Sequence, residues 1–282
     1  MIETVAIVGV GLIGGSFALA LRKAGFTGRI LGVSSARTLA AALDRGALDE
    51  GLSLEQAVPQ ADLVYLAHPI SRILDQLPAV AQLAKPSALV TDAGSTKAGI
   101  VARAAEVFPN SGAVFLGGHP MAGKVERGVE VAEADLFRDA AYVLTPAHAA
   151  DFEAPAAREF RGWLEKIGAR VLALSPDQHD RIVAFTSHLP QMASTALASL
   201  LFDQTSDSQG WDVAGGGLRD STRLARSAYE LWRDICLTNT ANIERALSLY
   251  IQKLEHLREN LRHPALAEEF RQGAQFASRA QK

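Results

Sequence analysis

The chain has 282 residues, a length that suggests two domains at about 150 residues per domain. Hydrophobic residues make up 48% and charged residues 21%, an ordinary globular mixture that excludes a disordered or collagen-like chain. The net charge of −3 leaves no basic surplus to neutralise phosphates, so we expect no nucleic-acid partner.

The rest of the composition points to a reducing compartment. The single cysteine, Cys236, cannot form an internal disulfide. No apolar run approaches the ~20 residues that span a bilayer, so we expect no membrane association. The first four residues lack the basic segment of a signal peptide and run directly into a strand-like segment. We therefore expect a cytoplasmic protein.

Residues 1–174 alternate between β-branched runs and stretches with helical spacing, such as 14–24 and 71–84. This alternation indicates βαβ units and a mainly parallel sheet. The connections between the later runs are short, so antiparallel pairing is open for those strands. The predicted strands are 4–10, 29–34, 62–67, 88–91, 113–116, 141–145 and 169–174.

The first strand leads into a glycine-rich turn. Gly9, Gly11 and Gly14 form the pattern G-x-G-x-x-G, with Leu12 and Ile13 at the start of the following helix. Gly9 permits the tight turn, Gly11 lets the backbone approach a pyrophosphate, and Gly14 allows close packing of helix on strand. The position of the pattern between a strand and a helix predicts dinucleotide binding, whereas a glycine-rich turn without a ligand is the alternative.

The end of the second strand bears on which dinucleotide binds. An acidic residue about 20 positions after the glycines would hold the ribose 2′-hydroxyl of NAD. This chain has Ser34, Ser35 and Arg37 there, while Asp44 lies deep in the next helix. Two hydroxyls and a guanidinium favour the 2′-phosphate of NADP. The alternative is that Arg37 is a solvated helix residue and that either cofactor is accepted.

The pattern changes after Leu174. Ser175, Pro176 and Asp177 have the residue types of a helix start, and few β-branched runs follow. We therefore expect a dinucleotide-binding domain of the Rossmann type over residues 1–174 and an all-α domain over 175–282. The predicted helices are 182–202, 220–228, 229–261 and 265–279, with a loop at 203–217.

Four further segments combine glycine with residues able to do chemistry. They are TDAGSTK at 91–97, GGHPMAG at 117–123, TSHLPQ at 186–191, and GGGLRDSTR at 215–223 with Trp232 after it. The second and third of these segments, found in this order, are highly specific together. Because of them, the chain resembles the prephenate/arogenate dehydrogenase (TyrA) family from Val5 to about Leu261.

The resemblance implies an α/β Rossmann-type N-terminal domain followed by an all-α dimerisation domain. It also implies an NAD- or NADP-dependent enzyme of tyrosine biosynthesis. Such an enzyme oxidatively decarboxylates prephenate to 4-hydroxyphenylpyruvate, or arogenate to tyrosine. Apolar, alanine-rich stretches such as 192–202 are too exposed for a small isolated domain, which also favours a homodimer. We expect no metal ion in the site.

His119 is the candidate catalytic base. A neutral imidazole can accept the proton of the substrate hydroxyl, and the glycines before His119 allow a ligand to approach closely. The alternative is a core histidine bonded to backbone. The resemblance also implies a catalytic role for Ser95, which orients this histidine in the family, although Ser95 could instead cap the helix starting near Thr96. Lys97 could be only a helix-surface residue.

Two arginines and a tryptophan are candidate substrate ligands. The resemblance implies that Arg223 binds a substrate carboxylate, for which its planar fork is suited. Arg219, four residues earlier, could add positive potential. Alternatively, Arg223 forms a surface salt bridge with Asp220. Trp232 matches a tryptophan beside the substrate in the family, but it could equally be a core residue.

The remaining candidate histidines are assigned either to the pocket or to structural hydrogen bonds. His188 matches a family histidine that faces the substrate. Nine residues of ideal helix separate it from His179 by half a turn, so we assign His188 to the pocket and His179 to a structural or interdomain hydrogen bond. His68 ends a strand at the cofactor edge of the sheet, which favours contact with ribose or nicotinamide.

The chain departs from the family pattern at two places. Gln191 stands where many members have a second histidine, and Lys124–Val125 replaces a common Thr-Glu pair. Both places lie near where the family recognises the substrate side chain. The choice between prephenate and arogenate therefore stays open, as does feedback by tyrosine.

Two other function classes fit these residues less well. A β-hydroxyacid dehydrogenase would need a lysine at the start of the helical domain, where this chain has His179 and His188. A non-catalytic dinucleotide sensor would need no proton acceptor such as His119.

Overall fold

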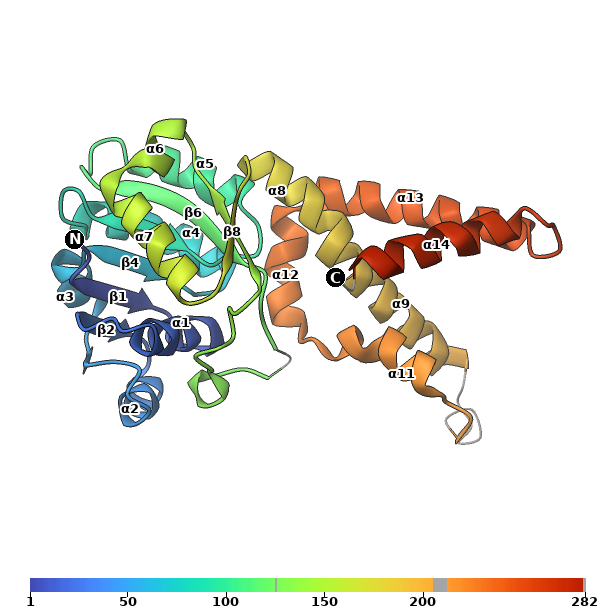
Figure 1. The fold of residues 1–282 in the computed structure, drawn as a ribbon, viewed down its shortest axis with the longest axis horizontal. Coiled ribbons are helices and arrows are strands. Elements are labelled where there is room, and N and C mark those ends of the chain that lie inside the picture. The colour runs from blue at the N-terminus through green and yellow to red at the C-terminus, as the bar shows by residue number, and fades with distance from the viewer. Residues whose placement is uncertain (125, 205–211, 281–282) are drawn as a thin grey trace.

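The computed structural model describes residues 1–124, 126–204 and 212–280 (Figure 1). The predicted loop at 203–217 lies partly outside the described residues. Within them, helix α9 continues to Gln204 and helix α11 begins at Gly216, so only the middle of that stretch remains untested as a loop.

A single eight-stranded sheet forms the core of the first part of the chain, in the order β3-β2-β1-β4-β5-β6-β7-β8. Neighbouring strands are parallel except β6 and β7, which run antiparallel. The strands are β1 (Thr4–Val8), β2 (Arg29–Val33), β3 (Glu50–Gly51), β4 (Leu63–Leu66), β5 (Leu89–Asp92), β6 (Val114–Pro120), β7 (Ala141–Thr145) and β8 (Arg170–Ala173).

All seven predicted strands are confirmed, and the open antiparallel pairing occurs once, between β6 and β7. The short edge strand β3 was missed because its two residues carry no periodic pattern. The strand order matters for function. The chain winds outward from β1 in both directions, and ligands of such sheets bind at that switch point, beyond the carboxyl ends of the strands.

Helices cover both faces of the sheet (Figure 1). Because side chains alternate along a strand, Val5 and Ile7 join the apolar cluster that contains Phe17 of α1. Ala6 and Val8 point to the other face, where α4 and α5 pack. The helices of this part are α1 (Leu12–Lys23), α2 (Ala36–Asp44), α3 (Leu54–Ala57), η1 (Val58–Gln60), α4 (Ile70–Leu83), α5 (Ala98–Val107), η2 (Val129–Val131), α6 (Ala149–Glu153) and α7 (Pro155–Lys166).

The second part of the chain contains only helices and helical turns as its described elements, and it extends away from the sheet (Figure 1). Ser175 caps its first helix, as predicted, by accepting a hydrogen bond from the backbone N–H of Gln178. The elements are α8 (Pro176–Val183), a π-helical turn η3 (Ala184–His188), α9 (Leu189–Gln204), α11 (Gly216–Thr222), a 3₁₀ turn η4 (Arg223–Arg226), α12 (Tyr229–Thr238), α13 (Thr240–Glu259) and α14 (Leu266–Ala280).

Three predicted helices need correction. The helix expected at 182–202 begins six residues earlier and contains a π turn. The helix expected at 220–228 is α11 followed by η4. The helix expected at 229–261 breaks at Asn239, whose buried side chain bonds to the Asp180 carbonyl and His188. Such long-range partners leave no local signal in the sequence.

The helical part packs directly against the sheet part. Ile235 of α12 and Ile243 of α13 belong to the same apolar cluster as the inner faces of α4 and α5. No helix among the described residues is long and apolar enough to cross a membrane.

Candidate active site

A cavity of about 370 Å³ opens where the carboxyl ends of the central strands meet the helical part. Its floor comes from the glycine turn after β1, the ends of β4 and β5, and the end of β6. Residues around the start of α12 close the opposite side. The predicted site residues that line it are Gly11, Leu12, Ile13, His68, Ser95 and His119.

The glycine turn has the geometry that a dinucleotide requires. Gly9 adopts a φ of +99°, and a Cβ on Gly14 would lie 2.1 Å from the Gly9 carbonyl oxygen. A Cβ on Gly11, by contrast, would meet no atom within 4 Å, because Gly11 faces the open cavity. No side chain caps the first turn of α1. Its backbone N–H groups and the helix dipole therefore suit a pyrophosphate.

The end of β2 lies beside this turn, since the Gly9 N–H donates to the Val33 carbonyl. Ser34 and Arg37 follow at the surface, and Arg37 is exposed. Ser35 is the N-cap of α2 and pairs with the Thr38 hydroxyl at 2.9 Å. These three residues stay outside the cavity lining but border the turn that leads into it.

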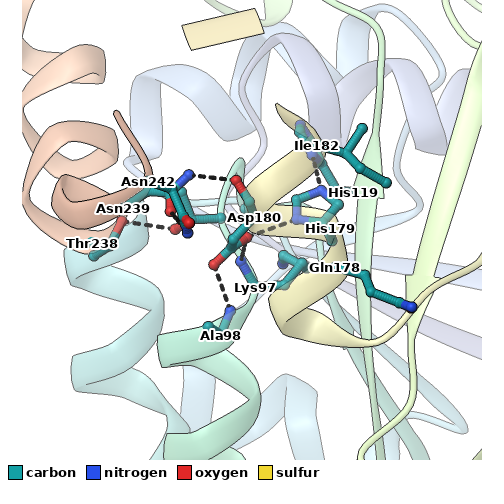
Figure 2. A network of polar contacts seen from close by, with 12 residues as sticks. Lys97, Ala98, His119, Gln178, His179, Asp180, Ile182, Thr238, Asn239 and Asn242 are labelled. Atoms are coloured by element: carbon teal, nitrogen blue, oxygen red, sulfur yellow. Dashed lines mark hydrogen bonds and ion pairs between the residues drawn. The ribbon is translucent and has the colours of Figure 1, made fainter. Parts of the chain in front are cut away.

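His119 is held by a residue from the helical part. Its Nδ1 lies 2.8 Å from Nε2 of His179, and Nδ1 of His179 lies 2.7 Å from Oδ1 of Asp180 (Figure 2). His119 ends β6, whereas His179 and Asp180 belong to α8. The predicted interdomain hydrogen bond of His179 is therefore confirmed, and its partner is the candidate catalytic residue.

Asp180 also caps a helix of the sheet part. Its carboxylate accepts from the backbone N–H groups of Lys97 and Ala98, at 2.7 and 2.9 Å, where α5 begins (Figure 2). Burial raises the pKa of Asp180, but the hydrogen bonds from His179 and these two N–H groups outweigh it, and the net pKa is lowered. Asp180 is thus an ionised carboxylate that can only accept hydrogen bonds.

Lys97 is not a helix-surface residue. Its side chain is fully buried, forms an ion pair with Asp92, and donates to the Gly118 carbonyl next to His119 at 2.9 Å. Burial lowers the pKa of this ammonium, while Asp92 opposes the shift. The sequence hid this role because Asp92 and Gly118 meet Lys97 only in the folded sheet.

The environment keeps the His119 imidazole neutral. Burial lowers its pKa well below 6.5, and the nearby charges of His179, Lys97 and His188 lower it further. A neutral ring with Nδ1 bonded to His179 has only Nε2 left to meet a ligand. His119 thus has the protonation state of a proton acceptor at neutral pH.

Ser95 lines the cavity and does not cap a helix. Helix α5 begins at Ala98, and the Asp180 carboxylate bonds to its first N–H groups. The alternative of an N-cap serine is therefore wrong. His68 also lines the cavity, with Nδ1 held 2.9 Å from Oε1 of Gln76 in α4.

His188 lies behind the cavity and does not line it. It is 1% exposed, bonds to Asn239, and meets the Trp232 ring edge-on at 5.8 Å. Burial lowers its pKa to about 4. The π turn changes the ideal-helix angle between His179 and His188, and both rings lower the pKa of His119. Trp232 packs against the core, and its buried indole N–H has no partner among the described residues.

Three predicted substrate residues of the helical part lie outside the cavity lining. The Gln191 amide donates to the Leu224 carbonyl at 2.9 Å and thereby ties α9 to η4. Arg223 begins η4, Arg219 lies in α11, and both are exposed. The structure does not bring these two arginines into the cavity lining.

Sequence reasoning missed several charged residues at the cavity mouth. Arg127 faces Glu230 at 3.8 Å across the opening between the two parts. Asp234 accepts from the Ser71 N–H at the start of α4 at 2.9 Å. An acidic residue in the middle of one helix can cap another helix only in the tertiary structure, so the sequence carried no signal. Among the described residues, no cluster of three or more His, Cys, Asp or Glu side chains could hold a metal ion.

A Rossmann-type sheet, a glycine turn open to the cavity, and a neutral histidine at the end of β6 define a nicotinamide-dinucleotide-dependent oxidoreductase. A family model described as the nucleotide-binding domain of prephenate dehydrogenase matches residues 17–173, and one described as its dimerization domain matches residues 175–275. The chain belongs to the prephenate dehydrogenase family.

Individual relatives agree with this assignment. A prephenate dehydrogenase of Bacillus subtilis (strain 168) is 35% identical, over 97% of this chain and 76% of its own length. The Aquifex aeolicus prephenate dehydrogenase in complex with hydroxyphenyl propionate and NAD+ superposes with a TM-score of 0.90 at 31% identity, covering 99% of both chains. Synechocystis arogenate dehydrogenase gives 0.83 at 31% identity, covering 98% of this chain and 99% of that one.

Proposed function

We propose that this chain oxidatively decarboxylates prephenate or arogenate with a nicotinamide dinucleotide, as a step in tyrosine formation. The observation that carries the proposal is the neutral His119, which lines the same cavity as the glycine turn that suits the dinucleotide. The β-hydroxyacid dehydrogenase alternative is not favoured, because Lys97, the buried lysine near the cavity, is paired with Asp92.

The reaction requires a proton acceptor, although overall it neither consumes nor releases a proton. Both substrates carry a hydroxyl and a hydrogen on the same ring carbon, with a carboxylate on the carbon opposite. The bound nicotinamide supplies the acceptor for the hydride that leaves this carbon. His119 takes the hydroxyl proton, so the carbon–oxygen bond becomes a carbonyl. The carboxylate then leaves as CO2, its bonding electrons restore the aromatic ring, and the phenolate oxygen regains the proton from His119.

The other residues hold the reactants. The turn of Gly9, Gly11, Leu12, Ile13 and Gly14 would carry the pyrophosphate on the first turn of α1. Ser95 and His68, both at the cavity wall, would contact the nicotinamide half of the cofactor.

We assign substrate binding to the helical part. Arg223 would bind a carboxylate, with Arg219 adding positive potential, while His188 and Trp232 would support the substrate pocket from behind through their edge-on ring contact. Gln191 of α9 would act by holding η4 in place through its bond to the Leu224 carbonyl. Arg223→Ala should raise the KM for the substrate more than it lowers kcat, and an unchanged KM would assign Arg223 to the surface instead.

The turnover experiment tests the whole proposal. Purified protein is given prephenate or arogenate with NAD or NADP, and the absorbance of the reduced cofactor is followed. We expect growth of that absorbance with at least one pair, and CO2 release in equal amount. Cofactor binding without reduction by either substrate would contradict the enzyme and favour a dinucleotide sensor.

We infer a preference for NADP over NAD. Ser34, Ser35 and Arg37 border the glycine turn and offer hydroxyls and a guanidinium, whereas no carboxylate ends β2. Replacing Ser34 with Asp together with Arg37→Ala should shift the ratio of kcat/KM values toward NAD by about tenfold or more, because each 1.4 kcal/mol gives a factor of ten. An unchanged ratio would mean that the 2′-position is recognised elsewhere.

We also propose a homodimer formed through the helical part. Self-association is supported by the match to a dimerization-domain model. Large apolar side chains are exposed on the helices of this part, and a monomer would leave them in water.

A further inference from the structure

Two buried residues of α8 are not assigned a role by the function proposed above. His179 and Asp180 are 0% and 1% exposed, and neither lines the cavity. They nevertheless form hydrogen bonds with the sheet part at two places, namely His119 at the end of β6 and the first N–H groups of α5 (Figure 2).

The direction of the hydrogen bonds can be worked out from Asp180. Its Oδ1 receives the Lys97 N–H, and its Oδ2 receives the Ala98 N–H. Backbone N–H groups can only donate, so the carboxylate is the acceptor in both bonds. The same carboxylate then accepts from Nδ1–H of His179 at 2.7 Å.

The bond between the two rings needs one donor. When Nδ1–H of His179 is given to Asp180, its Nε2 can present a lone pair and accept from Nδ1–H of His119. His119 then has its second lone pair on Nε2, the one ring nitrogen that remains for a ligand. The reverse arrangement would place a hydrogen on Nε2 of His119, and a nitrogen that carries a hydrogen cannot take the substrate proton.

We propose that His179 and Asp180 are positioning residues, forming a chain Asp180–His179–His119 that fixes the tautomer and orientation of the catalytic imidazole. The chain works like the carboxylate that orients the histidine of a serine hydrolase, with a second imidazole inserted between carboxylate and base. Because Asp180 also caps α5, docking of the helical part both completes the histidine chain and fixes the start of that helix.

This inference rests on the proposed function for its kinetic test. His179→Leu removes the acceptor for His119, whereas His179→Gln keeps an acceptor oxygen near the same place. We expect the leucine variant to lose about 10²-fold in kcat, the scale of general-base catalysis. The KM of the substrate and the Kd of the cofactor should change less than about threefold, since binding residues are untouched. The glutamine variant should recover most of the lost kcat.

Thr238→Val is the matched control. It removes a different interdomain hydrogen bond, between the hydroxyls of Thr96 and Thr238 at 2.7 Å, without touching an imidazole. Its kcat should stay within about twofold of the unaltered protein. Equal kcat losses in all three variants would show that domain docking alone matters, and would overturn the proposal. So would a leucine variant with full activity.

A second measurement needs no turnover, and a variant serves only to assign the signal. Protein labelled with ¹⁵N-histidine is studied by long-range proton–nitrogen NMR, and the His119 signal is identified by its loss in His119→Gln. We expect the proton on Nδ1 at neutral pH. A proton on Nε2 would overturn the inference. An inactive protein with the proton on Nδ1 would contradict the proposed function alone.

Discussion

At the scale of single residues, the site is defined by how its polar side chains are desolvated. His119 is 8% exposed, and burial, followed by its interactions with His179, Lys97 and His188, holds its pKa well below 6.5. Lys97 and Asp92 are buried together and satisfy one another. An unpaired charge in such a place would cost several kcal/mol, so these residues are coupled and neither can be replaced alone without loss.

The depressed pKa of His119 predicts the acid side of the pH profile. The base must be neutral to accept a proton, so activity is lost as the pH falls through the pKa of His119 and is retained above it. The titratable groups facing it are His179 and His188 from the helical part and Lys97 from the sheet part. We expect kcat/KM to stay level down through pH 6.5 and to fall only at lower pH.

Steady-state rates between pH 5 and 8 check this prediction. His119→Gln should lower kcat by about 10²-fold and remove the acid limb, because its amide does not titrate. An acid limb at or above pH 6.5 in the unaltered protein would contradict a buried, neutral base.

At the scale of elements, different glycines of the turn between β1 and α1 serve folding and ligand binding. A Cβ on Gly14 would meet the Gly9 carbonyl oxygen at 2.1 Å and the Ile7 side chain at 2.8 Å, so the third glycine is needed for packing. A Cβ on Gly11 would meet nothing, and the φ of −89° suits any residue. The second glycine is therefore needed only when a ligand approaches.

These two glycines give a matched pair of variants. Gly14→Ala should lower the free energy of unfolding by about 1–3 kcal/mol, as overpacking does, because helix α1 must move away from β1. Gly11→Ala should leave that free energy unchanged and weaken dinucleotide binding by about tenfold or more, corresponding to 1.4 kcal/mol. Urea unfolding and a cofactor titration measure the two effects. If both variants unfold alike, the division of roles is wrong.

At the scale of the whole molecule, the cavity exists because two parts of the chain dock. Two carboxylates of the helical part cap helices of the sheet part, Asp180 at α5 and Asp234 at α4. Ile235 and Ile243 continue the apolar core across the boundary. Farther out, α13 and α14 lie side by side (Figure 1), joined by Lys253 and Glu269. They expose apolar side chains that the docking does not cover.

This exposure predicts where a dimer forms. Phe270 and Phe276 of α14 are each 72% exposed, so charging them should not disturb the fold of one chain. Replacing both with Glu should convert the dimer into a 30.0 kDa monomer in sedimentation experiments, because burying two carboxylates is costly. Leu43→Glu, an exposed position in α2, is the control and should remain dimeric. A double variant that sediments as a dimer would place the interface elsewhere.

Much of the fold could be predicted from the sequence because its determinants are local. The strands follow from β-branched runs, the turn from three glycines within six positions, and the first helix of the second part from Ser175 and Pro176. These features rest on residues that are neighbours in the chain. His119 could be identified in the same way, from the residues beside it.

The rest of the site could not be predicted because it rests on distant pairs. Lys97 looks like a surface residue until Asp92, Gly118 and Asp180 surround it. The partner of His119 is 60 residues away on another domain. The angle that an ideal helix predicts between His179 and His188 does not apply, because η3 is a π turn.

By itself, the sequence determined the Rossmann turn, the order of most strands and helices, and the histidine proposed as the proton acceptor. Each depends on local backbone preferences and on residues a few positions apart. Only the tertiary structure decided which groups support that histidine and close its cavity. The physical reason is desolvation, since a buried polar group needs a partner, and docking of the helical part brings Asp180 and His179 to the groups that need them.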